Sequence, residues 1–194
     1  TCATDLERQE LLNFVIVGGG ATGVEVAGVL SEMKKSVIPH DYPELDHSLI
    51  NIYLIEASSK LLSAMSPEAS QKAERFLRRM GVNILLNKRV MDYKNYKVLL
   101  QDGSEIATRT FIWVSGIAGV SIGNMDPSMI GHGGRIKVDE FNRIPGMDSV
   151  FAIGDQCIMS GDESYPKGHP QLAQVAIQQG QLLAKNICRL EKGK

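Results

Sequence analysis

Apolar residues form short continuous runs near the start of the chain and one periodic stretch after them. The runs at residues 14–17 and 51–55 are β-rich and of strand length, which predicts buried strands. Over residues 67–80 the apolar positions recur at helical spacing, with Ser66 as the N-cap and Gly81 as the C-terminal stop. The apolar face of this predicted crossover helix consists of Ala69, Ala73, Phe76, Leu77 and Met80.

Short β-rich runs after this helix predict an antiparallel meander, with a turn at Asp102 and Gly103. The runs are residues 82–86, 89–94, 97–101 and 105–109. Residues 111–114 then predict a buried strand, in which Trp113 is expected to pack in the core. The strand leads to Gly116, where the absent side chain leaves room for a ligand over the strand ends.

The strand at residues 14–17 leads directly into Gly18, Gly20 and Gly23 and then into a helix. Gly18 permits a tight turn, Gly20 lets the backbone approach a pyrophosphate, and Gly23 lets helix and strand pack closely. The free amides of the helix N-terminus then face the phosphates. A structural glycine-rich turn is the alternative, but the strand before the glycines and the helix after them favour dinucleotide binding.

The strand at residues 51–55 ends at Glu56, which is followed by Ala57. A carboxylate at that position accepts hydrogen bonds from ribose hydroxyls and repels a 2′-phosphate, so the pattern favours NADH over NADPH. Glu56 lies further from the glycines than usual because a polar segment, residues 39–48, lengthens the crossover. A solvated strand-end glutamate is the alternative, and Lys60 is a nearby cation that could meet a 2′-phosphate.

Composition excludes several classes of protein. The 194 residues are 43% hydrophobic and 22% charged, as expected of a soluble globular chain. A net charge of −1, without basic runs interleaved with aromatics, excludes nucleic-acid binding. The apolar runs are too short to span a bilayer, and the N-terminus has no signal-peptide pattern. The chain does not begin with Met, which suggests an internal fragment.

The cysteines and histidines are too scattered to indicate a redox pair or a metal site. The odd number of cysteines argues against a disulfide framework, so a reducing compartment is expected. The cysteines are Cys2, Cys157 and Cys188. We interpret the stretch containing Asp41, Glu44, Asp46 and His47 as a solvated loop, and we expect no metal.

Two stretches near the C-terminus carry a resemblance to a known family. VFAIGD at residues 150–155 contains a predicted strand over residues 150–153, and AQVAIQQG opens a predicted helix over residues 172–188. With GGGATGVEVAG from Gly18 and WVSGI from Trp113, they resemble type II NADH dehydrogenases, the non-pumping NADH:quinone oxidoreductases. The resemblance covers nearly the whole chain. It implies an α/β fold in which a Rossmann-like parallel sheet carries an antiparallel meander in its second crossover, with a partial flavin-domain segment.

The resemblance also implies domains and site residues. Residues 1–12 would form an incoming linker or helix, residues 13–117 the NADH-binding domain, and residues 118–194 a returning segment of an incomplete FAD-binding domain. The residues implied to contact NADH are Gly18, Gly20, Ala21, Thr22, Gly23, Glu25, Glu56, Ala57, Val90 and Gly116. Those implied to contact FAD in the intact enzyme are Gly154, Asp155 and Gln174, with Asp155 binding the ribitol chain.

Glu25 and Gln174 are the candidate catalytic residues. The resemblance implies that Glu25 lies beside the nicotinamide and that Gln174 lies near the flavin and the quinone. Each has a simpler alternative, because a first-turn glutamate stabilises its helix through the dipole and a helical glutamine can merely be solvated.

The implied reaction passes a hydride from NADH to FAD and then two electrons to a quinone. The intact enzyme would lie peripherally on the cytoplasmic side of the cell membrane, whereas the soluble fragment is expected neither to hold FAD nor to be active alone. The apolar faces of its last strand and helix would dock on a second copy, as a homodimer, or stay mobile. The alternatives are a soluble FAD-dependent NAD(P)H reductase or oxidase with another acceptor, and a non-catalytic NADH-sensing module. Asp155 and Gln174 argue against the sensing module.

Overall fold

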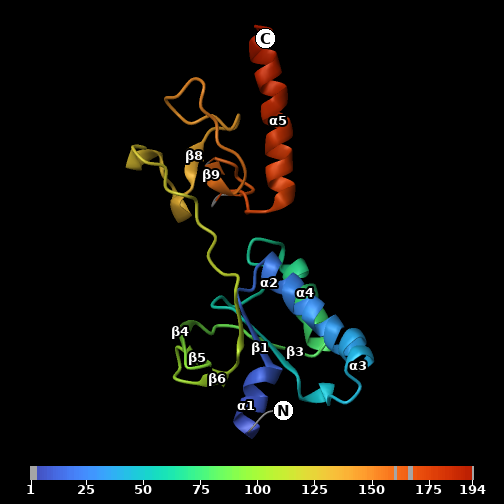
Figure 1. The fold of residues 1–194 in the computed structure, drawn as a ribbon. Coiled ribbons are helices and arrows are strands. Elements are labelled where there is room, and N and C mark those ends of the chain that lie inside the picture. The colour runs from blue at the N-terminus through green and yellow to red at the C-terminus, as the bar shows by residue number, and fades with distance from the viewer. Residues whose placement is uncertain (1–3, 160, 166–167, 194) are drawn as a thin grey trace. The chain divides into compact units, whose positions relative to one another are not determined.

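The computed structural model describes residues 4–159, 161–165 and 168–193 (Figure 1). The chain divides into two compact units, Thr1–Gly116 and Ile117–Lys194. The predicted α/β class is confirmed, because a parallel sheet with helices and a separate antiparallel sheet are both present.

The first unit is built on a parallel sheet of four strands in the order β3-β2-β1-β7. These strands are β1 (Asn13–Val17), β2 (Asn51–Ile55), β3 (Val82–Leu85) and β7 (Thr110–Trp113). Both faces of the sheet are covered (Figure 1). This burial on both sides explains why β1 and β2 are continuous apolar runs rather than alternating ones.

Two helices cover one face of this sheet. They are α2 (Ala21–Glu32) and α4 (Pro67–Arg79), and their buried residues Ala27 and Leu77 pack with Ile16 of β1 and Leu54 of β2. Before β1 lies α1 (Asp5–Leu12), which starts with a capping box. After α2 the chain continues through a π-helical turn, Met33–Val37, and α3 (Ile38–Asp41).

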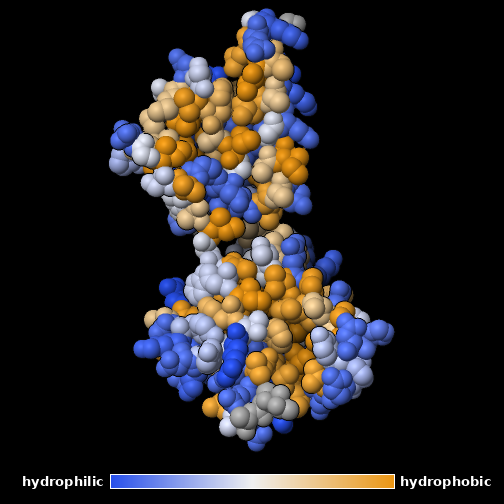
Figure 2. Space-filling model, viewed as in Figure 1, coloured by the Kyte–Doolittle hydropathy of each residue, from blue (hydrophilic) through white to orange (hydrophobic). Residues whose placement is uncertain are grey.

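The predicted helix over residues 67–80 is confirmed, including both of its ends. Ser66 Oγ accepts a hydrogen bond from the Ala69 amide at 3.2 Å, and Gly81 follows with a φ of 90°. Leu77 on the apolar face of this helix is buried, whereas Phe76 on the same face is 64% exposed. Phe76 lies at the flank of the apolar face, and apolar side chains gather over α2 and α4 in Figure 2.

The predicted antiparallel meander covers the other face of the sheet, but including residues 82–86 in it was wrong, because β3 pairs in parallel with β2 and extends the main sheet. It consists of β4 (Val90–Lys94), β5 (Lys97–Leu100) and β6 (Glu105–Ala107), with Gly103 in the turn at a φ of 82°. Val98 of β5 packs with Val15 and Val17 of β1, so residues of β1 alternate between the two layers. Near the turn, the Lys88 ammonium donates a hydrogen bond to Asp102.

The second unit contains a parallel pair of strands, β8 (Ile136–Val138) and β9 (Cys157–Met159), and the helix α5 (Ala173–Glu191). The helix predicted over residues 172–188 is therefore confirmed. The strand predicted over residues 150–153 is wrong. Only Phe151 pairs, in an isolated bridge with Arg143, and the hydrogen bonds of its neighbours go to a loop at residues 142–144.

Among the helices of the described ranges, none is both long enough and apolar enough to cross a bilayer.

Candidate dinucleotide-binding site

The glycine turn between β1 and α2 has a different physical requirement at each glycine. Gly18 has a φ of 117°, a conformation that favours glycine. A Cβ on Gly23 would lie 1.8 Å from the Gly18 carbonyl oxygen, so this helix and this turn can pack only without a side chain. At Gly20, no atom of the described residues lies within 4 Å of the Cβ position, which leaves the backbone open to a ligand.

The helix that follows presents its first amides without a side-chain cap. Gly20 is the N-cap of α2 and has no side chain to accept from those amides, while its carbonyl accepts from Val24 at 3.1 Å. Uncapped amides carry the positive end of the helix dipole, so the local electrostatics at Ala21, Thr22 and Gly23 favour an anion.

Glu56 lies directly against this turn, although the sequence separates it widely from the glycines. One of its carboxylate oxygens accepts a hydrogen bond from the Gly19 amide at 2.6 Å, and the other accepts from the Ser58 amide at 2.7 Å. A carboxylate has about four lone-pair sites, so two acceptor positions remain for hydroxyl groups. The geometry therefore suits a ribose at the end of β2.

The loop after β2 is tied to the same turn. The Leu62 amide donates to the Gly19 carbonyl at 2.7 Å, and the side chain of Leu61 is buried. Ala57 is exposed beside Glu56, and Lys60 is half-buried in this loop. Val90, at the start of β4, packs with the apolar cluster between the sheet and the meander.

The end of β7 reaches the glycine turn from the other side. The Val114 amide donates to the Val17 carbonyl at 2.9 Å, and a Cβ on Gly18 would lie 3.0 Å from the Ser115 nitrogen. Gly116 is exposed just beyond, with a φ of 82°. The structure thus brings together the predicted residues from the ends of β1, β2 and β7.

Trp113 is not a core residue, so its expected burial is wrong. The side chain is 56% exposed, its ring is tilted against Phe111 at 6.0 Å, and its indole N–H donates to the Ser115 carbonyl at 2.7 Å. β7 is an edge strand of the sheet, and Trp113 stands at its last position, where less of the meander covers it.

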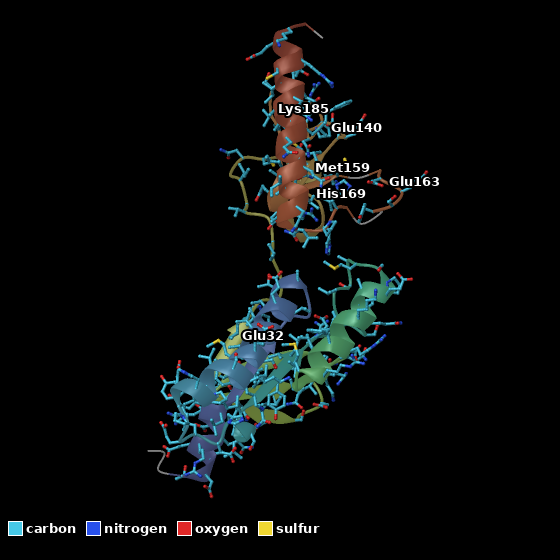
Figure 3. All side chains as sticks on the ribbon, turned by 90° about the vertical axis from the view of Figure 1, so that its right-hand side faces the viewer. Glu32, Glu140, Met159, Glu163, His169 and Lys185 are labelled. Carbon is cyan, nitrogen blue, oxygen red and sulfur yellow. The ribbon has the colours of Figure 1, made fainter. Side chains whose placement is uncertain are left out.

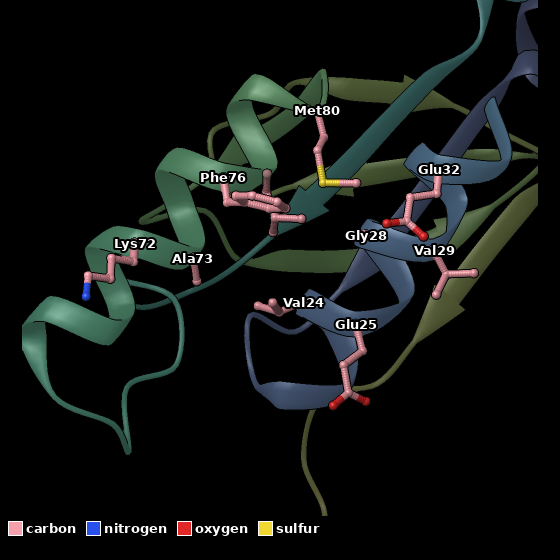
Figure 4. Close-up of a pocket in the computed structure, with 10 residues that line it drawn as sticks. Val24, Glu25, Gly28, Val29, Glu32, Lys72, Ala73, Phe76 and Met80 are labelled. Atoms are coloured by element: carbon pink, nitrogen blue, oxygen red, sulfur yellow. The ribbon is translucent and has the colours of Figure 1, made fainter. Parts of the chain in front are cut away.

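Glu25 lies on the exposed side of α2, at the rim of a groove between α2 and α4 (Figure 4). Gln174 is exposed in the first turn of α5, in the second unit. Their roles stay predictions.

The second unit places Gly154 and Asp155 in a short 3₁₀ turn, with Gly154 at a φ of 65° and the Asp155 side chain exposed. Sequence reasoning missed Gln179, which is buried and accepts a hydrogen bond from the Gly154 amide at 2.7 Å. Its helical spacing from Ala176, which also faces Gly154, was the available signal.

Further titratable groups of the second unit are Cys157, Cys188 and the pair of His169 and Asp162. Burial raises the pKa of the Cys157 thiol, and Cys188 is exposed on α5. His169, which is labelled in Figure 3, pairs with Asp162 at 2.9 Å and holds the pKa of that carboxyl below its usual range. Cys2 lies outside the described residues. Within those residues, no group of three or more His, Cys, Asp or Glu side chains is arranged to hold a metal ion.

Comparison with known proteins identifies the family of this chain. Residues 2–180 match a family model described as pyridine nucleotide-disulphide oxidoreductase. The chain is 32% identical to the type II NADH:quinone oxidoreductase NdhA of Mycobacterium tuberculosis, over 96% of this chain and 40% of that protein. It is 35% identical to the mitochondrial internal alternative NAD(P)H-ubiquinone oxidoreductase A1 of Arabidopsis thaliana, over 92% of this chain and 34% of that protein.

Solved structures share the fold of this chain. The structure of NDH2 from Plasmodium falciparum in complex with NADH has a TM-score of 0.69, at 24% identity, over 82% of this chain and 34% of that one. An NAD-dependent persulfide reductase from A. fulgidus has a TM-score of 0.67, at 23% identity, over 94% of this chain and 32% of that one. The resemblance to type II NADH:quinone oxidoreductases is confirmed, and the chain spans about 40% of the length of the first of these relatives.

Proposed function

Since the chain belongs to the pyridine nucleotide-disulphide oxidoreductase family, we propose that its first unit binds NADH. We further propose that the whole protein is a type II NADH dehydrogenase, which passes a hydride from NADH to FAD and two electrons on to a quinone. The observation that carries the first part is the contact of Glu56 with the Gly19 amide, beside the uncapped amides of α2.

In this proposal the residues of the first unit bind and orient the nucleotide. The amides at the start of α2 hold the pyrophosphate, because they are unpaired donors at the positive end of a helix. Glu56 accepts from the adenosine ribose hydroxyls, and Gly116 leaves space for the nicotinamide beyond β7. When bound, FAD supplies the hydride acceptor, and the roles proposed for Asp155, Glu25 and Gln174 toward flavin and quinone rest on the resemblance.

Glu56 further supports a preference for NADH over NADPH. Its carboxylate is fixed by two amides and cannot swing away from a 2′-phosphate without leaving both donors unpaired. The repulsion between the two negative groups then weakens NADPH binding. Lys60 is the cation that would reduce this effect if its ammonium reached the phosphate.

The test is a titration of the chain with NADH and with NADPH at constant ionic strength. Trp113 is the chain's single tryptophan and stands at the end of β7, so energy transfer from its emission to the reduced nicotinamide reports binding. We expect NADH to bind about tenfold more tightly, a difference of about 1.4 kcal/mol. Glu56→Gln should reduce the ratio of the NADH affinity to the NADPH affinity. Glu68→Gln on the exposed surface of α4 should leave that ratio unchanged. Equal affinities for the two cofactors in the unaltered chain would contradict the proposal.

The quinone and the cellular location are proposals about the whole protein. Support for the quinone comes from the names of the M. tuberculosis and A. thaliana relatives. We propose peripheral attachment to the cytoplasmic side of the cell membrane and association as a homodimer. NADH-dependent reduction of a short-chain quinone by the intact flavoprotein, compared with ferricyanide and oxygen as acceptors, tests the acceptor, and membrane fractionation tests the location.

A further inference from the structure

A lysine that the proposed NADH site does not use lies beside Glu56, just after the end of β3. The backbone amide of Lys88 donates to the Glu56 carbonyl at 3.1 Å, and the Asn87 amide donates to the Ser58 carbonyl at 3.0 Å. These hydrogen bonds fix the backbone of Lys88 against the residue that we propose to hold the adenosine ribose. A lysine ammonium on its flexible four-carbon stem is a mobile point charge that binds phosphate well.

In the structure this ammonium is bound by the meander instead. Lys88 Nζ donates to Oδ2 of Asp102, in the turn between β5 and β6. The other carboxylate oxygen of Asp102 accepts from the Ser104 hydroxyl at 2.6 Å and from the Ser104 amide at 3.2 Å. The Gln101 amide donates to the Arg89 carbonyl at 2.9 Å, which attaches this turn to the residue directly after Lys88. The carboxylate is therefore oriented by its own turn before it meets the lysine.

The pairing decides which charges surround the proposed ribose position. While Lys88 is paired with Asp102, the two side chains together contribute no net charge, and the repulsion between Glu56 and a 2′-phosphate is not offset from the side of β3. An unpaired Lys88 would bind the 2′-phosphate or neutralise Glu56. Either contact would reduce that repulsion, because opposite charges attract at short range even in a high-dielectric site.

We propose that Asp102 is a positioning residue for the nucleotide preference, because it holds the Lys88 ammonium on the meander turn and so withholds it from a 2′-phosphate. This inference rests on the proposed binding of NADH beside Glu56. Glu56 supplies the repulsion, and Asp102 keeps the neighbouring cation from cancelling it. The selection against NADPH is then shared between the end of β2 and a turn that lies far from it in the sequence.

The test compares the dissociation constants of NADH and NADPH in the unaltered chain, in Asp102→Asn and in a matched control. Asparagine keeps an oxygen for Ser104 and removes only the charge. The control is Glu105→Gln, because Glu105 forms an exposed ion pair with Lys97 at 2.7 Å elsewhere on the same meander. We expect Asp102→Asn to strengthen NADPH binding relative to NADH binding by about threefold, and Glu105→Gln to leave the ratio unchanged. Circular dichroism melting verifies that each variant is folded.

A second substitution separates the effect of the freed lysine from a change in the shape of the turn. A chain with both Asp102→Asn and Lys88→Gln should return to the ratio of the unaltered chain, because no ammonium is released. A distorted turn would not be repaired in this way. The NADPH affinity of Asp102→Asn should also fall more steeply with added salt than that of the double variant, since salt screens the new attraction.

An unchanged ratio in Asp102→Asn would overturn the inference, as would a double variant that keeps the ratio of the single one or an equal response in Glu105→Gln. If the unaltered chain prefers NADH and one of these results is found, the inference fails and the proposed function stands. An unaltered chain that binds neither nucleotide would instead contradict the proposed function, and the inference with it.

Discussion

Two glycines in α2 differ so much in their surroundings that the same substitution should have opposite effects on stability. At Gly23 an added Cβ would lie 1.8 Å from the Gly18 carbonyl oxygen, whereas at Gly28 its nearest neighbour is a Leu77 methyl group at 3.9 Å. We therefore compare Gly23→Ala with Gly28→Ala in the same chain. Alanine favours the helix by about 1 kcal/mol at either position, so this contribution cancels in the comparison.

The steric contribution decides whether each substitution lowers or raises the free energy of unfolding. Overpacking costs about 1–3 kcal/mol, and the upper end applies at Gly23 because a backbone oxygen cannot rotate away as a side chain can. Gly23→Ala should therefore lower the free energy of unfolding by about 2 kcal/mol, and Gly28→Ala should raise it by about 0.5–1 kcal/mol. For a unit the size of Thr1–Gly116, 1 kcal/mol corresponds to about 4 °C in melting temperature.

Thermal melts followed by Trp113 fluorescence measure these shifts, because the tryptophan lies in the first unit. We expect the melting temperature to fall by about 8 °C in Gly23→Ala and to rise by about 2–4 °C in Gly28→Ala. Gly23→Ala should also abolish NADH binding, since the turn must move to accept the methyl group. An unchanged melting temperature and NADH affinity in Gly23→Ala would refute the packing argument.

Three further predictions concern single side chains. Glu56→Ala should lower the free energy of unfolding by about 1–3 kcal/mol in a urea titration without nucleotide, because it leaves the buried Gly19 amide unpaired; an unaltered midpoint would contradict this. The Lys88 ammonium holds the pKa of Asp102 below its usual range, so its stabilising effect is present at neutral pH and lost as the pH falls through that lowered pKa. Asp102→Asn should accordingly flatten the decline of melting temperature below about pH 4, and an identical acid decline in both proteins would count against it. Burial raises the pKa of the Cys157 thiol, so iodoacetamide should modify Cys188 much faster, as measured by peptide mass spectrometry, and comparable rates would exclude the buried position.

The local elements of the first unit could be predicted because their signals lie within a few residues. The strand β2 ends where its apolar run ends, and α4 begins after Ser66 and stops before Gly81, because capping and periodicity act over one or two turns. The glycine turn could also be predicted, since tight turning and close packing require glycine itself.

Other predictions failed where the outcome depended on strand order and packing partners. The exposure of Trp113 follows from the edge position of β7, which no local pattern encodes. An apolar run at residues 150–153 reads as a strand, yet the backbone pairs only at Phe151, because a strand requires a partner along its length. Phe76 lies on the apolar face of α4 as predicted, and only the packing leaves it exposed, at the flank that opens into the groove.

By itself the sequence determined the α/β class, the glycine turn and the acidic residue at the end of β2. The tertiary structure decided that Glu56 contacts the Gly19 amide, that Gln179 accepts from the Gly154 amide, and that an apolar groove lies between α2 and α4. Periodicity and turn chemistry are local and can be read along the chain, whereas these contacts join residues that only the packing of strands and helices brings within hydrogen-bonding distance.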